Sequence, residues 1–174
     1  ISDTCFYLVG AGAAERFHMR WFADHMPAGV TVTPVTTRRA GFAIAGPNAR
    51  TLLSRLTTED VSNDAFKFLA TRDIEVAMTP VRAMRIAFTG DLGWELHVPA
   101  EYQRTLYMAL REAGADLGLG LAGSRALDSL RLEKSYGRWG TEFTADTTPQ
   151  ESGLDRFVRL DKPAKFIGKE ALQR

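Results

Sequence analysis

The feature that most constrains the fold is a set of three short segments, 73–78, 83–88 and 93–98, whose side chains alternate in character. A period of two residues is typical of a strand that buries one face. The last two segments are joined by the turn Thr-Gly-Asp-Leu at 89–92, which is short enough for neighbouring strands to run antiparallel. We therefore expect a small antiparallel sheet in the middle of the chain.

Segments with helical spacing lie on both sides of these strands. The expected helices are 13–26, 49–56, about 100–113 and about 124–136. Further strands are expected at 4–9, 30–33 and 41–45, the last two forming a hairpin across the basic turn 36–39. Strands and helices do not alternate in a βαβ rhythm, so the predicted fold class is α+β, with helices packed on small antiparallel sheets.

Composition excludes several classes of function. Lys and Arg number 22 against 21 Asp and Glu, and a net charge of +1 does not favour nucleic acid as a partner. No apolar run approaches the roughly 18 residues of a membrane span, so no membrane partner is expected. Cys5 is the single cysteine and the histidines are scattered, so we expect neither an internal disulfide nor a metal site. The chain is interpreted as intracellular.

Glu95 interrupts an apolar strand between Trp94 and Leu96. Alternation places its carboxylate on the face opposite those two side chains. One interpretation is that Glu95 simply points to solvent. The other is that a carboxylate beside Phe88 and Trp94 accepts the N–H donors of a flat heterocycle that stacks on the aromatic rings. The spacing of these residues leaves both interpretations open.

The expected helix 124–136 carries several charged residues. A surface with ion pairs is the simpler interpretation, because Arg131 lies near Glu133 and Ser135. Alternatively, Arg131 or Lys134 binds the anionic tail of a ligand. No Gly-x-Ser-x-Gly, Walker or His-Glu-x-x-His signature is present to assign a reaction.

Four ordered blocks resemble the aminomethyltransferase (glycine-cleavage T-protein) superfamily: 88–96, 129–140, 148–154 and 166–170. Within this superfamily, the motifs are most similar to those of the C-terminal folate region of dimethylglycine and sarcosine dehydrogenases, in which Trp-Glu-Leu-His and Leu-Arg-Leu-Glu-Lys-Ser-Tyr are typical. Leu127 stands where T-proteins usually carry an arginine directed at the folate tail. The resemblance implies the aminomethyltransferase folate-binding fold, with ferredoxin-like elements.

The resemblance also implies roles for particular residues. Glu95 would hydrogen-bond the pterin ring, Phe88 would occupy a position that is usually tyrosine, and Thr71 would line the same pocket. Trp94 and Arg131 complete the predicted cofactor-binding set. Phenylalanine lacks the tyrosine hydroxyl, and the lost hydrogen bond would cost about 1 kcal/mol. No metal ligand is implied.

The implied activity belongs to a longer protein. The family's catalytic aspartate precedes the segment that begins at Ile1, so we expect no catalytic residue and no turnover in this chain. Both ends are expected to be cut. Residues 1–140 are predicted to be a folate-binding domain that lacks its N-terminal part, and 141–174 an ordered connection toward a missing C-terminal barrel domain.

The implied function is the tetrahydrofolate-binding part of a flavin-dependent dehydrogenase. Such an enzyme captures an oxidised N-methyl carbon as 5,10-methylenetetrahydrofolate, with a small N-methylated amine as substrate and FAD in an upstream domain. The alternatives are a T-protein-type aminomethyltransferase or folate-dependent demethylase, and a non-catalytic folate-binding or regulatory module. The expected location is cytoplasmic, or the mitochondrial matrix in a eukaryote.

Overall fold

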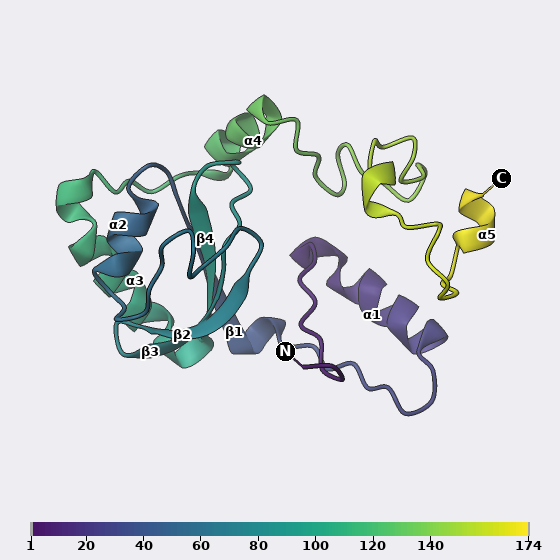
Figure 1. Ribbon diagram of the computed structural model, residues 1–174, viewed down its shortest axis with the longest axis horizontal. Coiled ribbons are helices and arrows are strands. Elements are labelled where there is room, and N and C mark those ends of the chain that lie inside the picture. The colour runs from purple at the N-terminus through teal and green to yellow at the C-terminus, as the bar shows by residue number, and fades with distance from the viewer. Residues whose placement is uncertain (1, 174) are drawn as a thin grey trace. The chain divides into compact units, whose positions relative to one another are not determined.

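The computed structural model describes residues 2–173 and divides the chain into two compact units, Ile1–Lys134 and Ser135–Arg174. The elements are labelled in Figure 1. The first unit contains the helices α1 (Glu15–His25), α2 (Ala49–Ser54), α3 (Gln103–Ala113) and α4 (Ser124–Glu133), and the strands β1 (Arg39–Ala45), β2 (Thr71–Val76), β3 (Thr79–Met84) and β4 (Gly93–Pro99). The second unit contains one short helix, α5 (Lys169–Leu172).

The four strands form one sheet with the order β1-β4-β3-β2. Every neighbouring pair is antiparallel. Strands β2, β3 and β4 follow one another along the chain, whereas β1 pairs with β4 at the far side of the sheet. The predicted α+β class is confirmed, with helices packed on one small antiparallel sheet where several were expected.

The core lies on one face of this sheet, where α2 and α3 pack (Figure 1). On β4 the side chains of Trp94, Leu96 and Val98 are fully buried and those between them are not, as a period of two requires. Helix α3 contributes Leu106 and Leu110, which lie one turn apart on the same face. Gly114 follows α3 at its C-terminal end, where the sequence predicts the stop.

Three of the expected strands are wrong in place or pairing. Residues 4–9 form no strand, and the only ladder contact described there is an isolated bridge between Ser2 and Cys5. Residues 30–33 are irregular, so there is no hairpin with 41–45. A β-branched run becomes a strand only where a neighbour offers backbone partners, and β1 finds its partner in β4. The strand expected at 83–88 is β3, which begins four residues earlier.

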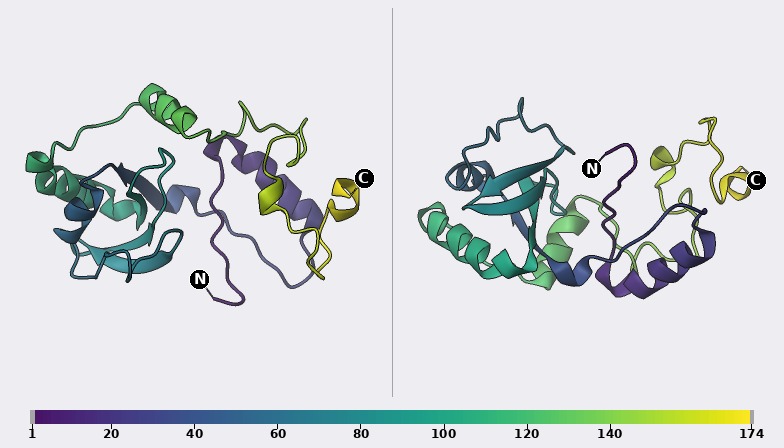
Figure 2. Two further views of the ribbon diagram at one scale, coloured as in Figure 1. Left: turned by 45° about the horizontal axis from the view of Figure 1, so that its top comes forward. Right: turned by 90° about the horizontal axis from the view of Figure 1, so that it is seen from below.

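The second unit, Ser135–Arg174, follows an irregular path that the green-to-yellow colours trace in Figure 2. Besides α5, it contains a 3-10 turn at Asp155–Phe157. No hydrophobic side chain described between 135 and 173 is fully buried. The division at residue 134 is six residues before the predicted limit at 140, and the role of 141–174 as a connection to a barrel stays a prediction.

Within residues 2–173, no helix is both long and apolar enough to pass through a lipid bilayer.

A candidate ligand site on the outer face of the sheet

The sheet face opposite the core, here called the outer face, carries the polar residues that matter for binding. Strand register fixes which of them are neighbours, because residues directly opposite in an antiparallel pair project to the same face. Glu95 lies opposite Met84, and Met84 lies opposite Thr71. Thr71 and Glu95 therefore belong to one row on the outer face, with Met84 between them.

The next row on the outer face consists of Asp73, Arg82 and His97, again in cross-strand register. His97 lies two residues after Glu95 on β4, so both side chains point to this face. Their side chains are half-buried, with 31% of Glu95 and 13% of His97 exposed. The Nε2 atom of His97 is 3.5 Å from Oε2 of Glu95.

Tyr7 reaches this row from the N-terminal segment. Its hydroxyl oxygen lies 2.9 Å from Nδ1 of His97, and the two rings meet edge to face with centroids 5.7 Å apart. The guanidinium of Arg82 lies over the Tyr7 ring at 5.1 Å from its centroid. A continuous chain of contacts thus runs from Arg82 through Tyr7 and His97 to Glu95.

Arg82 is itself held by an ion pair with two hydrogen bonds. Its Nε and Nη2 atoms donate to the two carboxylate oxygens of Asp73 at 2.8 and 2.7 Å. The hydrogen bonds from Arg82 lower the pKa of Asp73, against a smaller opposing effect of burial. The same pair raises the pKa of Arg82, so both groups are charged at neutral pH.

Trp94 points the other way. It is fully buried in the core, where its ring meets Phe66 edge to face at 6.1 Å. The guanidinium groups of Arg50 and Arg85 lie 5.3 and 5.8 Å from the indole centroid. Glu95 and Trp94 therefore project to opposite faces of β4, and the interpretation in which both contact one flat ligand does not fit this strand.

Phe88 and Thr71 remain candidates for the outer face. Thr71 is exposed at the start of β2, in the row of Glu95. Phe88 is half-buried in the loop between β3 and β4. The same loop approaches α4, because a Cβ atom added to Gly90 would meet the Lys134 side chain at 2.6 Å. The predicted contacts of Thr71 and Phe88 with a cofactor stay predictions.

Arg131 has a different environment. It is only 3% exposed on α4, and its Nε atom lies 3.3 Å from Oδ1 of Asp128, three residues earlier on the same helix. The contact with Asp128 agrees with an ion pair, but the burial of Arg131 does not agree with the expected place on the surface. A contact of Arg131 with an anionic ligand also stays a prediction.

His97 and Tyr7 are not among the predicted site residues. The signal for His97 was present, since a position two residues from Glu95 on a strand shares its face. No local signal exists for Tyr7, which is 90 residues away from His97 along the chain.

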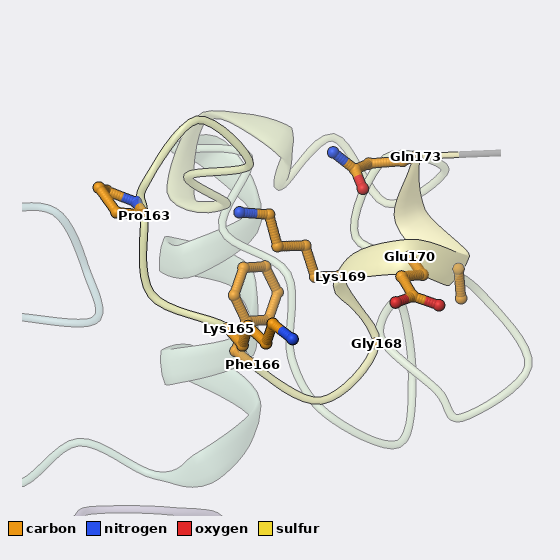
Figure 3. Close-up of a pocket in the computed structure, with 8 residues that line it drawn as sticks. Pro163, Lys165, Phe166, Gly168, Lys169, Glu170 and Gln173 are labelled. Carbon is orange, nitrogen blue, oxygen red and sulfur yellow. The ribbon is translucent and has the colours of Figure 1, made fainter.

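Two pockets lie on the described surface. One, of about 470 Å³, lies at the β2 edge of the sheet and includes Asp73 and Arg82 of the outer face in its lining. The other, of about 610 Å³, lies in the second unit, where Figure 3 shows Lys169 beside the ring of Phe166 and Glu170 nearby. Nζ of Lys169 donates to the carbonyl of Lys162 at 2.7 Å. Among residues 2–173, no three His, Cys, Asp or Glu side chains are grouped so that they could hold a metal ion.

A four-stranded antiparallel sheet whose outer face presents a half-exposed carboxylate defines a candidate binding domain. Residues 1–162 match the GCVT N-terminal domain, and the chain belongs to this family. Its curated relatives include mitochondrial dimethylglycine dehydrogenase of Mus musculus, with 44% identity over 171 residues, covering 97% of this chain and 20% of the relative. Mitochondrial sarcosine dehydrogenase of Homo sapiens is 43% identical over 131 residues, covering 75% of this chain and 14% of that protein.

An aminomethyltransferase of Listeria monocytogenes is 37% identical over 172 residues, covering 98% of this chain and 46% of the relative. The chain thus spans about a fifth of the length of the dimethylglycine dehydrogenase and just under half that of the aminomethyltransferase.

Proposed function

We propose that this chain is the tetrahydrofolate-binding portion of a flavin-dependent dehydrogenase that acts on dimethylglycine, sarcosine or a similar N-methylated amine. The observation that carries the proposal is the position of Glu95, a half-exposed carboxylate in one cross-strand row with Thr71. Similarity to dimethylglycine dehydrogenase over 97% of the chain supports the same proposal.

Glu95 is suited to a pterin ring for a simple chemical reason. An ionised carboxylate has two acceptor oxygens, and a pterin presents adjacent N–H donors in one plane. Thr71 adds a hydroxyl in the same row, and Phe88 adds an apolar ring without a hydroxyl. Water is only partly excluded from Glu95, which is 31% exposed, so a bound ring would strengthen these hydrogen bonds by covering the carboxylate.

The proposed cofactors, tetrahydrofolate and FAD, would act in different parts of a longer protein. Tetrahydrofolate supplies two nitrogen atoms that together hold a one-carbon unit as 5,10-methylenetetrahydrofolate, and FAD in another part of the longer protein supplies the oxidation of the N-methyl group. The residues of this chain bind and orient the pterin. The location is proposed as the mitochondrial matrix in a eukaryote and the cytoplasm otherwise.

A T-protein-type aminomethyltransferase is the second candidate. It is favoured by the match between 98% of this chain and the Listeria aminomethyltransferase. Leu127 argues against it, because it stands where T-proteins usually carry an arginine and is 38% exposed on α4. The two candidates share the pterin site and differ in the origin of the one-carbon unit.

Calorimetric titration with 5-formyltetrahydrofolate tests the proposal. We expect saturable binding to the wild-type chain, weakened at least ten-fold by Glu95→Ala, which corresponds to about 1.4 kcal/mol. Glu75→Ala is the matched control, because Glu75 is an exposed glutamate on the outer face of β2, in a different row. It removes the same charge and should leave the affinity unchanged.

Equal weakening by both substitutions would mean that charge on the outer face, and not a specific contact, governs binding. No heat of binding in a sample shown to be folded by circular dichroism would reject folate as the ligand of this chain.

A further inference from the structure

His97 is a polar side chain that the proposed pterin site does not by itself explain. Only 13% of it is exposed, and its two ring nitrogens each face a polar group. Nδ1 is 2.9 Å from the Tyr7 hydroxyl, and Nε2 is 3.5 Å from Oε2 of Glu95. The imidazole thus lies between a phenol and the carboxylate assigned to the ligand.

The two neighbours of His97 select one tautomer. A carboxylate only accepts hydrogen bonds, so Nε2 must carry a proton if it is to interact favourably with Glu95. Neutral imidazole then has a lone pair on Nδ1, to which the Tyr7 hydroxyl can donate. The opposite tautomer would direct the Nε2 lone pair at a negative oxygen, which is repulsive.

We propose that His97 is a positioning residue for Glu95, and that Tyr7 holds it in the tautomer protonated on Nε2. The Nε2–H group faces Oε2 of Glu95 at 3.5 Å and so fixes the orientation of the carboxylate, whose two oxygens keep lone pairs free to accept from the ligand. This deepens the proposed function, since the ligand that Glu95 would bind is the pterin ring of folate. An oriented carboxylate loses less side-chain entropy on binding than a freely rotating one.

The surroundings hold the Tyr7–His97 contact in place. Arg82 lies over the Tyr7 ring and is bonded through two hydrogen bonds to Asp73. On the other side, Gly41 of β1 lies opposite His97, and a Cβ atom there would be 4.0 Å from the imidazole. The ring is therefore bordered by strand backbone on one side and by Tyr7 on the other.

The first test measures the tautomer directly, without any ligand. Nitrogen-15 NMR of the histidine ring in the 174-residue chain, at a pH where the ring is neutral, should show His97 protonated on Nε2. Tyr7→Phe should shift the His97 signals toward a mixture of tautomers, because the donor to Nδ1 is lost. A wild-type His97 protonated on Nδ1, or signals unaffected by Tyr7→Phe, would overturn the proposal.

The second test measures affinity for 5-formyltetrahydrofolate. His97→Phe keeps a ring but loses the N–H donor, and we expect about ten-fold weaker binding, or about 1.4 kcal/mol. His97→Gln keeps a side-chain N–H donor at a similar reach, and should bind within about three-fold of wild type, which corresponds to about 0.7 kcal/mol. His25→Phe is the matched control, because His25 stacks on Trp21 in α1 and does not belong to the outer face.

The two tests separate this inference from the proposed function. Wild-type affinity in a folded His97→Phe variant, or failure of glutamine to restore what phenylalanine loses, would overturn the positioning role. If the wild-type chain does not bind the folate at all, the proposed function fails, and the tautomer measurement alone decides whether His97 orients Glu95.

Discussion

The two regions of the chain that differ most are the sheet region, residues 39–113, and the tail region, which is the second unit Ser135–Arg174. Phenylalanine shows the difference directly. Phe66 of the sheet region is fully buried, whereas Phe157 of the tail region is 69% exposed. The sheet region brings distant segments together around apolar side chains, since β1 and β4 are paired across some 50 residues of sequence.

The tail region is held mainly by polar contacts that are local in sequence. The backbone N–H and hydroxyl of Thr148 both donate to Glu151, at 2.8 and 2.9 Å, and the backbone N–H of Glu151 returns a bond to the Thr148 hydroxyl at 3.2 Å. Arg159 pairs with Asp161 two residues later. Exposed local bonds of this kind contribute little to global stability, so cooperative folding should depend on the sheet region.

The largest expected effect compares the same substitution in the two regions. Phe66→Ala removes a ring from the core and should lower the free energy of unfolding by about 4 kcal/mol. Phe157→Ala removes a ring that is already mostly in water and should change it by less than about 0.5 kcal/mol. Urea denaturation followed by circular dichroism measures both.

Phe66→Leu serves as a graded variant in case the alanine form does not fold, with an expected loss of about 1 to 2 kcal/mol. Equal losses for Phe66→Ala and Phe157→Ala would show that the tail region folds cooperatively with the sheet region, and that its local polar contacts are not its main support.

A second pair of substitutions tests how rigid each region is. At Gly93 an added Cβ would lie 2.5 Å from the backbone oxygen of Ile44, inside the β1–β4 ladder. At Gly137 it would meet the ring of Phe143, a half-buried side chain in the tail region that can turn away. Gly93→Ala should therefore lower the free energy of unfolding by about 2 kcal/mol and Gly137→Ala by less than about 1 kcal/mol, as measured by thermal denaturation. A larger loss at Gly137 would mean that the tail region packs as tightly as the sheet.

The turn between β2 and β3 is a strained position within the sheet region. Ala77 and Met78 have φ angles of +49° and +58°, in the left-handed region, and Met78 is 86% exposed. Hairpin turns of this geometry favour Asn-Gly or Gly-Gly because side chains with a Cβ are disfavoured there. Met78→Gly should raise the free energy of unfolding by about 1 kcal/mol. Met78→Ala removes the same exposed side chain but keeps the Cβ, so a similar gain in that variant would argue against backbone strain as the cause.

This turn also explains how far the fold could be predicted from the sequence. The helices α1 to α4, strand β4 and the opposite orientation of Glu95 and Trp94 follow from helical spacing and strand alternation, which are local signals. Strand β3 begins four residues before its predicted start, because Ala77-Met78 has no turn-forming residue and the expected strand 73–78 therefore continues through the turn. The run 30–33 favours a strand by its composition, but no described strand pairs with it. Whether a pairing strand exists depends on residues that are distant in sequence.

The candidate site was predictable only in part for the same reason. Strand alternation makes Glu95 a candidate, whereas Thr71 follows only from the resemblance, and cross-strand register puts the two in one row through Met84. The contact between Tyr7 and His97 depends on a segment whose path cannot be read from its own composition. The burial of Arg131 likewise depends on how α4 packs, which no spacing rule specifies.

The smallest expected effect compares two ion pairs of the same kind. Arg82–Asp73 in the sheet region leaves 15% of the arginine side chain exposed, whereas Arg159–Asp161 in the tail region leaves 71%. Arg82→Gln should cost about 0.5 kcal/mol at pH 7, since Asp73 is itself exposed and solvent screens the pair. Arg159→Gln should leave the urea midpoint unchanged.

The effect of pH shows whether charge causes the loss in Arg82→Gln. Hydrogen bonding to Arg82 lowers the pKa of Asp73 in the folded chain below its unfolded value of about 3.9, so unfolding favours uptake of a proton in acid. The stabilisation is complete above that unfolded value and disappears as the pH falls through the lower folded pKa. The difference between wild type and Arg82→Gln should therefore be constant from pH 7 to about pH 5 and should shrink below pH 4. A difference that persists undiminished at pH 2 would mean that Arg82 stabilises the sheet by packing its side chain on Tyr7, and not through the charge of Asp73.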